Sequence, residues 1–168
     1  MNFCSVACNV TSLVLAIYPF ALRAQSCVPL DGVWKLTPKS SYLGSGLSFN
    51  PYYTITGIQL TIRTEQSQIA QEWNFTGPHI QRHTVYKLNP DGVRAATAIA
   101  NATDFEYIAT TAVWQNCTLI VTGLSRLFGL EVSTTNTYVV SENGTTLTIL
   151  QYGESPISVV DRRLVFTK

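Results

Sequence analysis

The sequence has few charged side chains, and the two signs of charge nearly cancel. Lysine, arginine, aspartate and glutamate make up 12% of the 168 residues, with 11 basic and 10 acidic side chains. A nucleic-acid partner requires a clustered basic face, and a polybasic membrane contact requires a run of lysine and arginine. The sequence shows neither pattern, which disfavours both kinds of partner.

Residue types that carry catalysis or bind metals are also scarce. His79 and His83 are the only two histidines. On one extended strand they would lie about 13 Å apart, too far to share a zinc ion. Neither a Gly-x-Ser-x-Gly motif nor a His-Glu-x-x-His motif is present. We therefore predict no metal site, no cofactor and no catalytic residue, and we favour a protein that is not an enzyme.

The start of the chain has the composition of a secretory signal peptide. Residues 10–22 are almost entirely apolar, and this stretch is shorter than the roughly 20 residues that span a bilayer. Small residues suitable for cleavage follow it. We predict residues 1–26 as the signal peptide and residues 27–168 as the domain of a secreted or periplasmic protein. The alternatives are an uncleaved anchor and a lipoprotein attached through Cys27.

The cysteine count supports export. Two of the four cysteines, Cys4 and Cys8, lie in the predicted signal peptide, so Cys27 and Cys117 remain. An even pair in an exported chain favours a disulfide. This bond would close a long loop and tie the N-terminal segment to the rest of the domain. Two free thiols are the alternative.

Almost every segment after residue 30 has the pattern of a β-strand, because threonine, valine, isoleucine and tyrosine dominate and long amphipathic helical stretches are absent. Strands with one apolar face are typical of antiparallel sheets. Ten candidate strands cover residues 31–37, 53–64, 68–75, 80–88, 94–99, 104–114, 117–124, 130–140, 145–152 and 157–167. We predict one all-β domain, an antiparallel up-and-down barrel of about 8–10 strands, with a sandwich as the alternative.

Alternation along these strands predicts an interior lined by aromatic rings and a few polar groups, which is how small-molecule sites are usually built. Arg82 would meet the carboxylate head group of a ligand, and aromatic rings would surround the tail. The candidate ligand-binding residues are Trp73, Arg82, Tyr86, Phe105, Tyr107 and Tyr138. The alternative is an interior filled by these side chains.

Three local features complete the prediction. In residues 105–113 the odd-numbered side chains are expected to share one face of a strand. Asn143-Gly144 suits a tight type I′ hairpin. Residues 38–52 read as a loop rich in glycine, serine and proline, which would be either a lid at an open end of the barrel or an ordinary crossing loop.

Residues 31–40 read Asp-Gly-Val-Trp-Lys-Leu-Thr-Pro-Lys-Ser. The Gly-x-Trp on the first strand, together with a basic last strand, resembles the signature of the lipocalins, a family of calycin barrels. The resemblance implies that Trp34 closes the base of the barrel and that Arg163 packs across its ring, a contact with favourable cation–π energy. The two ends of the domain also resemble small exported bacterial proteins of unknown function that begin Asp-Gly-x-Trp-Lys-Leu.

These patterns support three hypotheses of function. The first is a monomeric, secreted or periplasmic lipocalin-like barrel that binds a small apolar or amphipathic ligand, with no stable membrane span after signal cleavage. The second is a structural or interaction protein with a filled barrel and no ligand. The third is an isomerase or cyclase that acts on a lipid bound inside the barrel. Fold resemblance alone does not decide among them.

Overall fold

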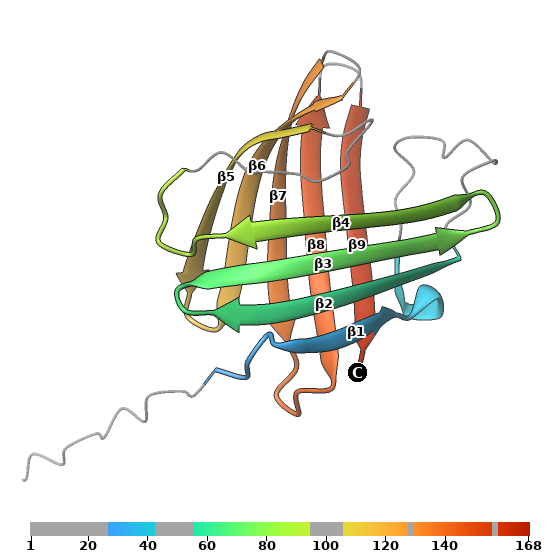
Figure 1. The fold of residues 1–168 in the computed structure, drawn as a ribbon, viewed down its shortest axis with the longest axis vertical. Coiled ribbons are helices and arrows are strands. Elements are labelled where there is room, and N and C mark those ends of the chain that lie inside the picture. The colour runs from blue at the N-terminus through green and yellow to red at the C-terminus, as the bar shows by residue number, and fades with distance from the viewer. Residues whose placement is uncertain (1–26, 43–55, 95–105, 128–129, 156–157) are drawn as a thin grey trace, which may run out of the picture.

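The computed structural model describes residues 27–42, 56–94, 106–127, 130–155 and 158–168 (Figure 1). Within these residues, one sheet of nine antiparallel strands follows the order β4-β3-β2-β1-β9-β8-β7-β6-β5, so the predicted up-and-down barrel is confirmed. The elements are β1 (Gly32–Leu36), the 3-10 helix η1 (Pro38–Ser40), β2 (Gly57–Glu65), β3 (Gln68–Gly77), β4 (Ile80–Leu88), β5 (Glu106–Gln115), β6 (Thr118–Leu127), β7 (Leu130–Val140), β8 (Thr146–Ser155) and β9 (Ser158–Thr167).

Some predictions fall outside this part of the chain. The signal peptide predicted at residues 1–26 lies outside the described residues, and so do Phe105 and nearly all of the candidate strand at residues 94–99. Of the loop predicted at residues 38–52, the structure describes residues 38–42.

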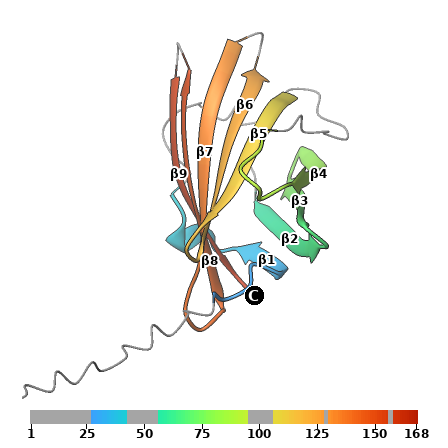
Figure 2. The same ribbon diagram turned by 90° about the vertical axis from the view of Figure 1, so that its left-hand side faces the viewer.

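The barrel has two walls that cross each other. Strands β2, β3 and β4 run across the front of strands β5 to β9 (Figure 1), and the turned view shows these two groups facing each other (Figure 2). Strand β1 belongs to both walls because it pairs with β2 along one edge and with β9 along the other. Side chains that point between the walls form the core.

Two junctions in the wall of the barrel have few strand pairs, one between β1 and β9 inside the strand order and one between its two ends, β4 and β5. Between β1 and β9 the ladder has two residue pairs, but Tyr42 then pairs with Arg163 through two backbone hydrogen bonds of 2.7 and 2.8 Å. Between β4 and β5 a single bridge joins Asp91 to Val113, and the amide of Gly92 donates to Ala112 O at 2.9 Å. The barrel is therefore nearly closed.

The core includes a cluster of fully buried side chains at the end of the barrel that holds the C-terminus, which Figure 1 marks with a C. Burial of a large apolar side chain stabilises the fold by about 1.5–3 kcal/mol, so this cluster supplies much of the driving force for folding. Five side chains there have no exposed surface, namely Trp34, Leu60, Leu119, Leu147 and Phe166.

A β-bulge changes the face assignment predicted for residues 105–113. The pairing of β5 with β6 shifts register between Tyr107 and Ala109. After this shift Thr110 and Ala112 are the buried residues, and Ala109, Thr111 and Val113 lie together on the other face. The prediction that these three share a face with Tyr107, before the bulge, is therefore wrong. A bulge adds one residue to a strand and so reverses the alternation beyond it.

The β7–β8 connection is also longer than predicted. Residues 141–145 separate the two strands, and Gly144 has a φ of +71° whereas Asn143 does not take a positive φ. A type I′ turn requires positive φ at both central residues, so the predicted turn type is wrong. Instead Asn143 Oδ1 accepts hydrogen bonds from Ser141 Oγ and from the amide and hydroxyl of Thr145, which fix the wider turn.

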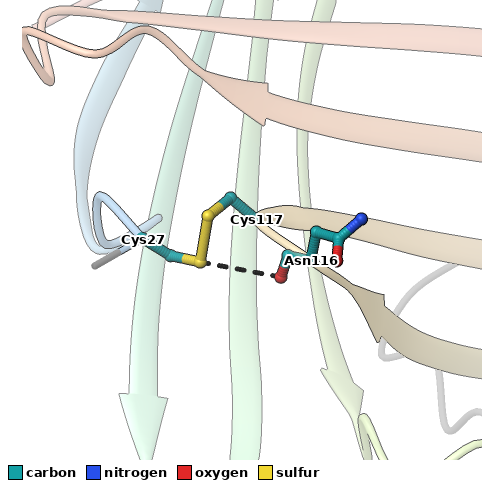
Figure 3. Close-up of a disulfide and its surroundings, with 3 residues drawn as sticks. All are labelled: Cys27, Asn116 and Cys117. Carbon is teal, nitrogen blue, oxygen red and sulfur yellow. Dashed lines mark hydrogen bonds between the residues drawn. A yellow bond between two sulfur atoms is a disulfide. The ribbon is translucent and has the colours of Figure 1, made fainter. Parts of the chain in front are cut away.

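Cys27 and Cys117 form the predicted disulfide (Figure 3). Their Cα atoms lie 5.0 Å apart, and the bond joins the segment before β1 to the two-residue turn between β5 and β6. The carbonyl oxygen of Asn116 lies 3.6 Å from Cys27 Sγ. Because a disulfide sulfur carries no hydrogen, this is a close contact in the oxidised protein and becomes a hydrogen bond only when Cys27 is a thiol.

Candidate functional site

Strand pairing arranges the interior of the larger wall in rows of directly opposed residues. The first two rows from the C-terminal end are apolar, and they include Phe166 beside Leu147 and Leu164 beside Ile149. The same end of the interior receives Trp34 and Leu60 from the other wall. This half of the barrel is a packed core.

The next row is polar, and we call it the polar row. Arg162 on β9 pairs with Gln151 on β8, and Gln151 pairs with Asn136 on β7. All three share the inward side of their strands, because Leu164, Ile149 and Tyr138 two residues away are buried. Asn136 is itself buried, and Nε of Arg162 has less than 1 Å² of exposed surface. Burying polar groups is costly unless they are hydrogen-bonded, so three adjacent polar residues distinguish this level of the barrel from the apolar rows.

A row of small side chains follows the polar row. This small-residue row contains Gly153, Thr134, Gly123 and Thr110 on four neighbouring strands. All four are buried, so they face the interior. Glycine and threonine occupy much less volume than the leucine, isoleucine and phenylalanine of the packed half. The interior is therefore divided into a packed apolar half and a half lined by small and polar groups.

Gln71 links the two walls across this division. It lies on β3 and is 2% exposed. Its Oε1 accepts a hydrogen bond of 3.2 Å from the hydroxyl of Tyr138 on β7 and one of 3.3 Å from Nε1 of Trp73. Strands β3 and β7 are not neighbours in the sheet. The Gln71–Tyr138 bond therefore spans the interior and places a polar group at its centre.

Four of the six residues predicted to bind a ligand occupy inward-facing positions. Trp73 stacks on Phe75 with ring centroids 5.9 Å apart and meets Phe166 edge-on at 6.1 Å. Arg82 pairs with Phe75, and Tyr86 pairs with Gln71, so both lie on the inward side of β4. Tyr138 is the fourth, through its bond to Gln71.

The other two predicted ligand-binding residues have less structural information. Phe105 lies outside the described residues. For Tyr107 the structure gives the backbone position, opposite Ser125 and next to the bulge in β5. Their contribution to a site stays a prediction.

Trp34 is fully buried, and a different cation from the expected one covers its ring. Its Nε1 donates to Leu30 O at 2.8 Å, and Nζ of Lys168 lies 4.5 Å from the ring centroid. Arg163 is exposed, and its Nη2 donates to Ser40 O at 3.1 Å, on the outer side of the barrel. Lys168 thus makes the cation–π contact that the resemblance assigned to Arg163. A lysine after the last strand gives no periodic signal in the sequence.

The interior role of Arg162 and Gln151 was also not foreseen. The structure leaves Asp161 exposed opposite Tyr152, while Arg162 alternates with the buried residues Leu164 and Phe166. The sequence pattern of β9 could have indicated this position, because Arg162 has the same even-numbered spacing as the apolar residues Leu164 and Phe166.

The acidic and histidine side chains whose exposure the structure describes lie on the outside. All are exposed except Glu72, which alternates with the inward-facing Gln71 and Trp73 and so faces outward. Glu72 Oε1 lies 3.0 Å from Nε2 of His83, so these two side chains are joined by a hydrogen bond on the surface. Among the residues that the structure describes, no group of three His, Cys, Asp or Glu side chains could hold a metal ion.

On the outer face of β8, Tyr152 donates a hydrogen bond to the carboxylate of Glu154. This bond raises the pKa of Tyr152 above 10.0, and the negative charge of Asp161 acts in the same direction. Nearby on the outside, Leu150, Tyr152 and Val159 are about half exposed. The outer wall therefore carries several exposed apolar side chains between charged ones.

No helix among the described residues is long and apolar enough to cross a bilayer. The chain matches no protein-family model and no curated protein sequence.

Proposed function

We propose that the protein is an exported, lipocalin-like carrier that binds one small amphipathic molecule in the less densely filled half of its barrel. The observation that carries this proposal is the division of the interior. Large apolar residues fill one half, and the other half has the polar row and the small-residue row. A site that surrounds an apolar body and offers a few polar groups is typical of small-molecule binding.

The disulfide supports the export part of the proposal. Disulfides persist in oxidising compartments such as the periplasm and the extracellular space. The Cys27–Cys117 bond is consistent with removal of residues 1–26 and with a secreted or periplasmic location.

Native mass spectrometry of the exported protein, purified with its disulfide intact and without detergent, tests the proposal. We expect a bound mass that leaves on denaturation. A bare protein mass from repeated mild preparations would contradict a carrier function.

A matched pair of variants localises the ligand. Thr134 is buried in the small-residue row, whereas its neighbour Thr135 faces the other side of β7. Thr134→Leu adds volume inside and should reduce the bound mass, whereas Thr135→Leu should retain it. Equal occupancy in both variants would place the ligand elsewhere.

A second candidate function is supported by the outer face of β8 and β9. Tyr42, Leu150, Tyr152 and Val159 are each 47–53% exposed, and exposed apolar groups of this kind can mark an interaction surface. A protein that carries no ligand but forms a complex through these residues would fit this function. Substituting Leu150 and Tyr152 with serine should then abolish the complex without lowering stability.

A further inference from the structure

The side-chain amide of Gln71 has a chemically fixed orientation. The indole N–H of Trp73 is a donor and never an acceptor, so the amide atom that faces it at 3.3 Å must be the oxygen. The hydroxyl of Tyr138 approaches the same oxygen at 3.2 Å. With two donors on Oε1, both lone pairs of that oxygen are used. The opposite end of the amide, Nε2, therefore presents two N–H donors away from these partners.

Nε2 of Gln71 is buried and has no hydrogen-bond partner within the described part of the protein. Buried side-chain donors almost always have a partner, and an unsatisfied one is unfavourable. The two accepted bonds hold the amide in place, so it cannot rotate to satisfy the nitrogen without losing them. A donor held in this way in the centre of a barrel is suited to an acceptor that arrives from outside the chain.

The charge carried by the barrel interior favours an acceptor that is negative. Tyr86 on β4 pairs directly with Gln71. On β7, Asn136 lies two residues before Tyr138, the residue that donates to Gln71. Among the inward-facing strand positions whose side chains the structure describes, the charged residues are Arg82 and Arg162, both positive. Hydrogen bonds to a charged acceptor are shorter and stronger than those to a neutral one.

We propose that Gln71 is a specificity-determining residue that selects a ligand carrying a carboxylate at its buried end, through hydrogen bonds from the side-chain amide to a carboxylate oxygen. The inference rests on the proposed carrier function and adds the ligand class to it. The ligand enters head first, with the carboxylate at Gln71 and the apolar tail toward the small-residue row.

Two probes with the same alkyl chain and opposite head groups test this assignment. The full chain is expressed for export, purified with its disulfide, stripped of bound lipid, and titrated with dodecanoate and with dodecylammonium by calorimetry. Dodecanoate should bind roughly 10- to 100-fold more tightly, as expected for a hydrogen bond between a buried donor and a charged acceptor. In Gln71→Met, which keeps the length of the side chain, dodecanoate should lose roughly tenfold in affinity while dodecylammonium changes little.

Glu72→Gln is the matched control, because it alters the adjacent residue on the outer face of the same strand. Its affinities for both probes should equal those of the unaltered protein. If Gln71→Met does not fold, the side-chain amide resonances of Gln71 in the unaltered protein provide the readout. They should shift on addition of dodecanoate and stay unchanged with dodecylammonium.

The outcomes separate this inference from the carrier function. Equal binding of both probes, or full dodecanoate affinity in Gln71→Met, would overturn the role of Gln71 and leave an apolar carrier. A bound natural mass in native spectrometry with no affinity for either probe would overturn the carboxylate class while keeping the carrier. No bound mass and no probe binding would overturn both.

Discussion

Loss of the Cys27–Cys117 disulfide should cost this protein a large part of its stability. The bond closes a loop with a sequence separation of 90 residues. The chain-entropy relation gives about 4–5 kcal/mol for a loop of this size, because the cross-link removes conformations from the unfolded state. The segment that follows Cys27 is also held by contacts other than the disulfide, because Leu30 and Trp34 are buried and the Trp34 indole donates to Leu30 O. The native fold should therefore persist without the bond, and the loss should come mainly from the unfolded state.

The double variant Cys27→Ala/Cys117→Ala measures this loss without leaving free thiols. Urea unfolding followed by tryptophan fluorescence gives the free energy of unfolding, and a thermal scan should show a midpoint lowered by roughly 10–20 °C. Chemical reduction of the unaltered protein is the control, and it should give a similar loss. A loss below about 1 kcal/mol would refute the entropic reasoning, since it would mean that the unfolded chain already keeps these segments together.

The remaining predictions concern the base and the outer wall of the barrel. Trp34→Ala should lower the free energy of unfolding by about 3–5 kcal/mol, as measured by urea denaturation, because a fully buried indole leaves a cavity; an unchanged midpoint would contradict its place in the core. Lys168→Met should lower the free energy of unfolding by about 0.5–1 kcal/mol, because the cation–π contact with Trp34 is lost. Arg163→Met should leave tryptophan fluorescence unchanged. The reverse result would mean that Arg163, and not Lys168, contacts the Trp34 ring. Because Tyr152 has a raised pKa in the folded protein, its bond to Glu154 contributes below pH 10 and is lost as the pH rises through the folded value. Glu154→Gln should therefore let this phenol ionise at lower pH in an ultraviolet titration, and an unshifted curve would show that the bond does not form.

Much of the barrel follows from local patterns in the sequence. The alternation of Ile58, Leu60 and Ile62 fixes the inward side of β2, and all three are buried as this pattern requires. Short turns join β2 to β3, β3 to β4 and each successive pair from β5 to β9, and they leave little choice but to pair these neighbours. The pairing of Cys27 with Cys117 followed from there being two cysteines after the predicted signal peptide.

Features that depend on long-range packing were harder to predict. The bulge near Tyr107 has no signature in a run of alanine, threonine and valine, because either face of that run is acceptable in a barrel wall. The cation that covers the Trp34 ring depends on where the chain lies after β9. Arg163 and Lys168 are both positive, so their charge alone does not predict which of them contacts the ring. The bond from Tyr138 to Gln71 joins residues 67 positions apart, so no local pattern reports it.

The meeting of β1 with β9 also sets the order in which the molecule can assemble. Strand β1 leaves the ribosome first, yet its partners Phe166 and Thr167 belong to the last strand. Pairings this distant in sequence form slowly, because a large loop must close before the contacts form. The disulfide can form earlier, because Cys117 precedes β7, β8 and β9 in the chain, and it then keeps β1 beside the growing wall. The cross-link can thus act as a folding tether: it keeps β1 in the position where β9 pairs with it and completes the barrel.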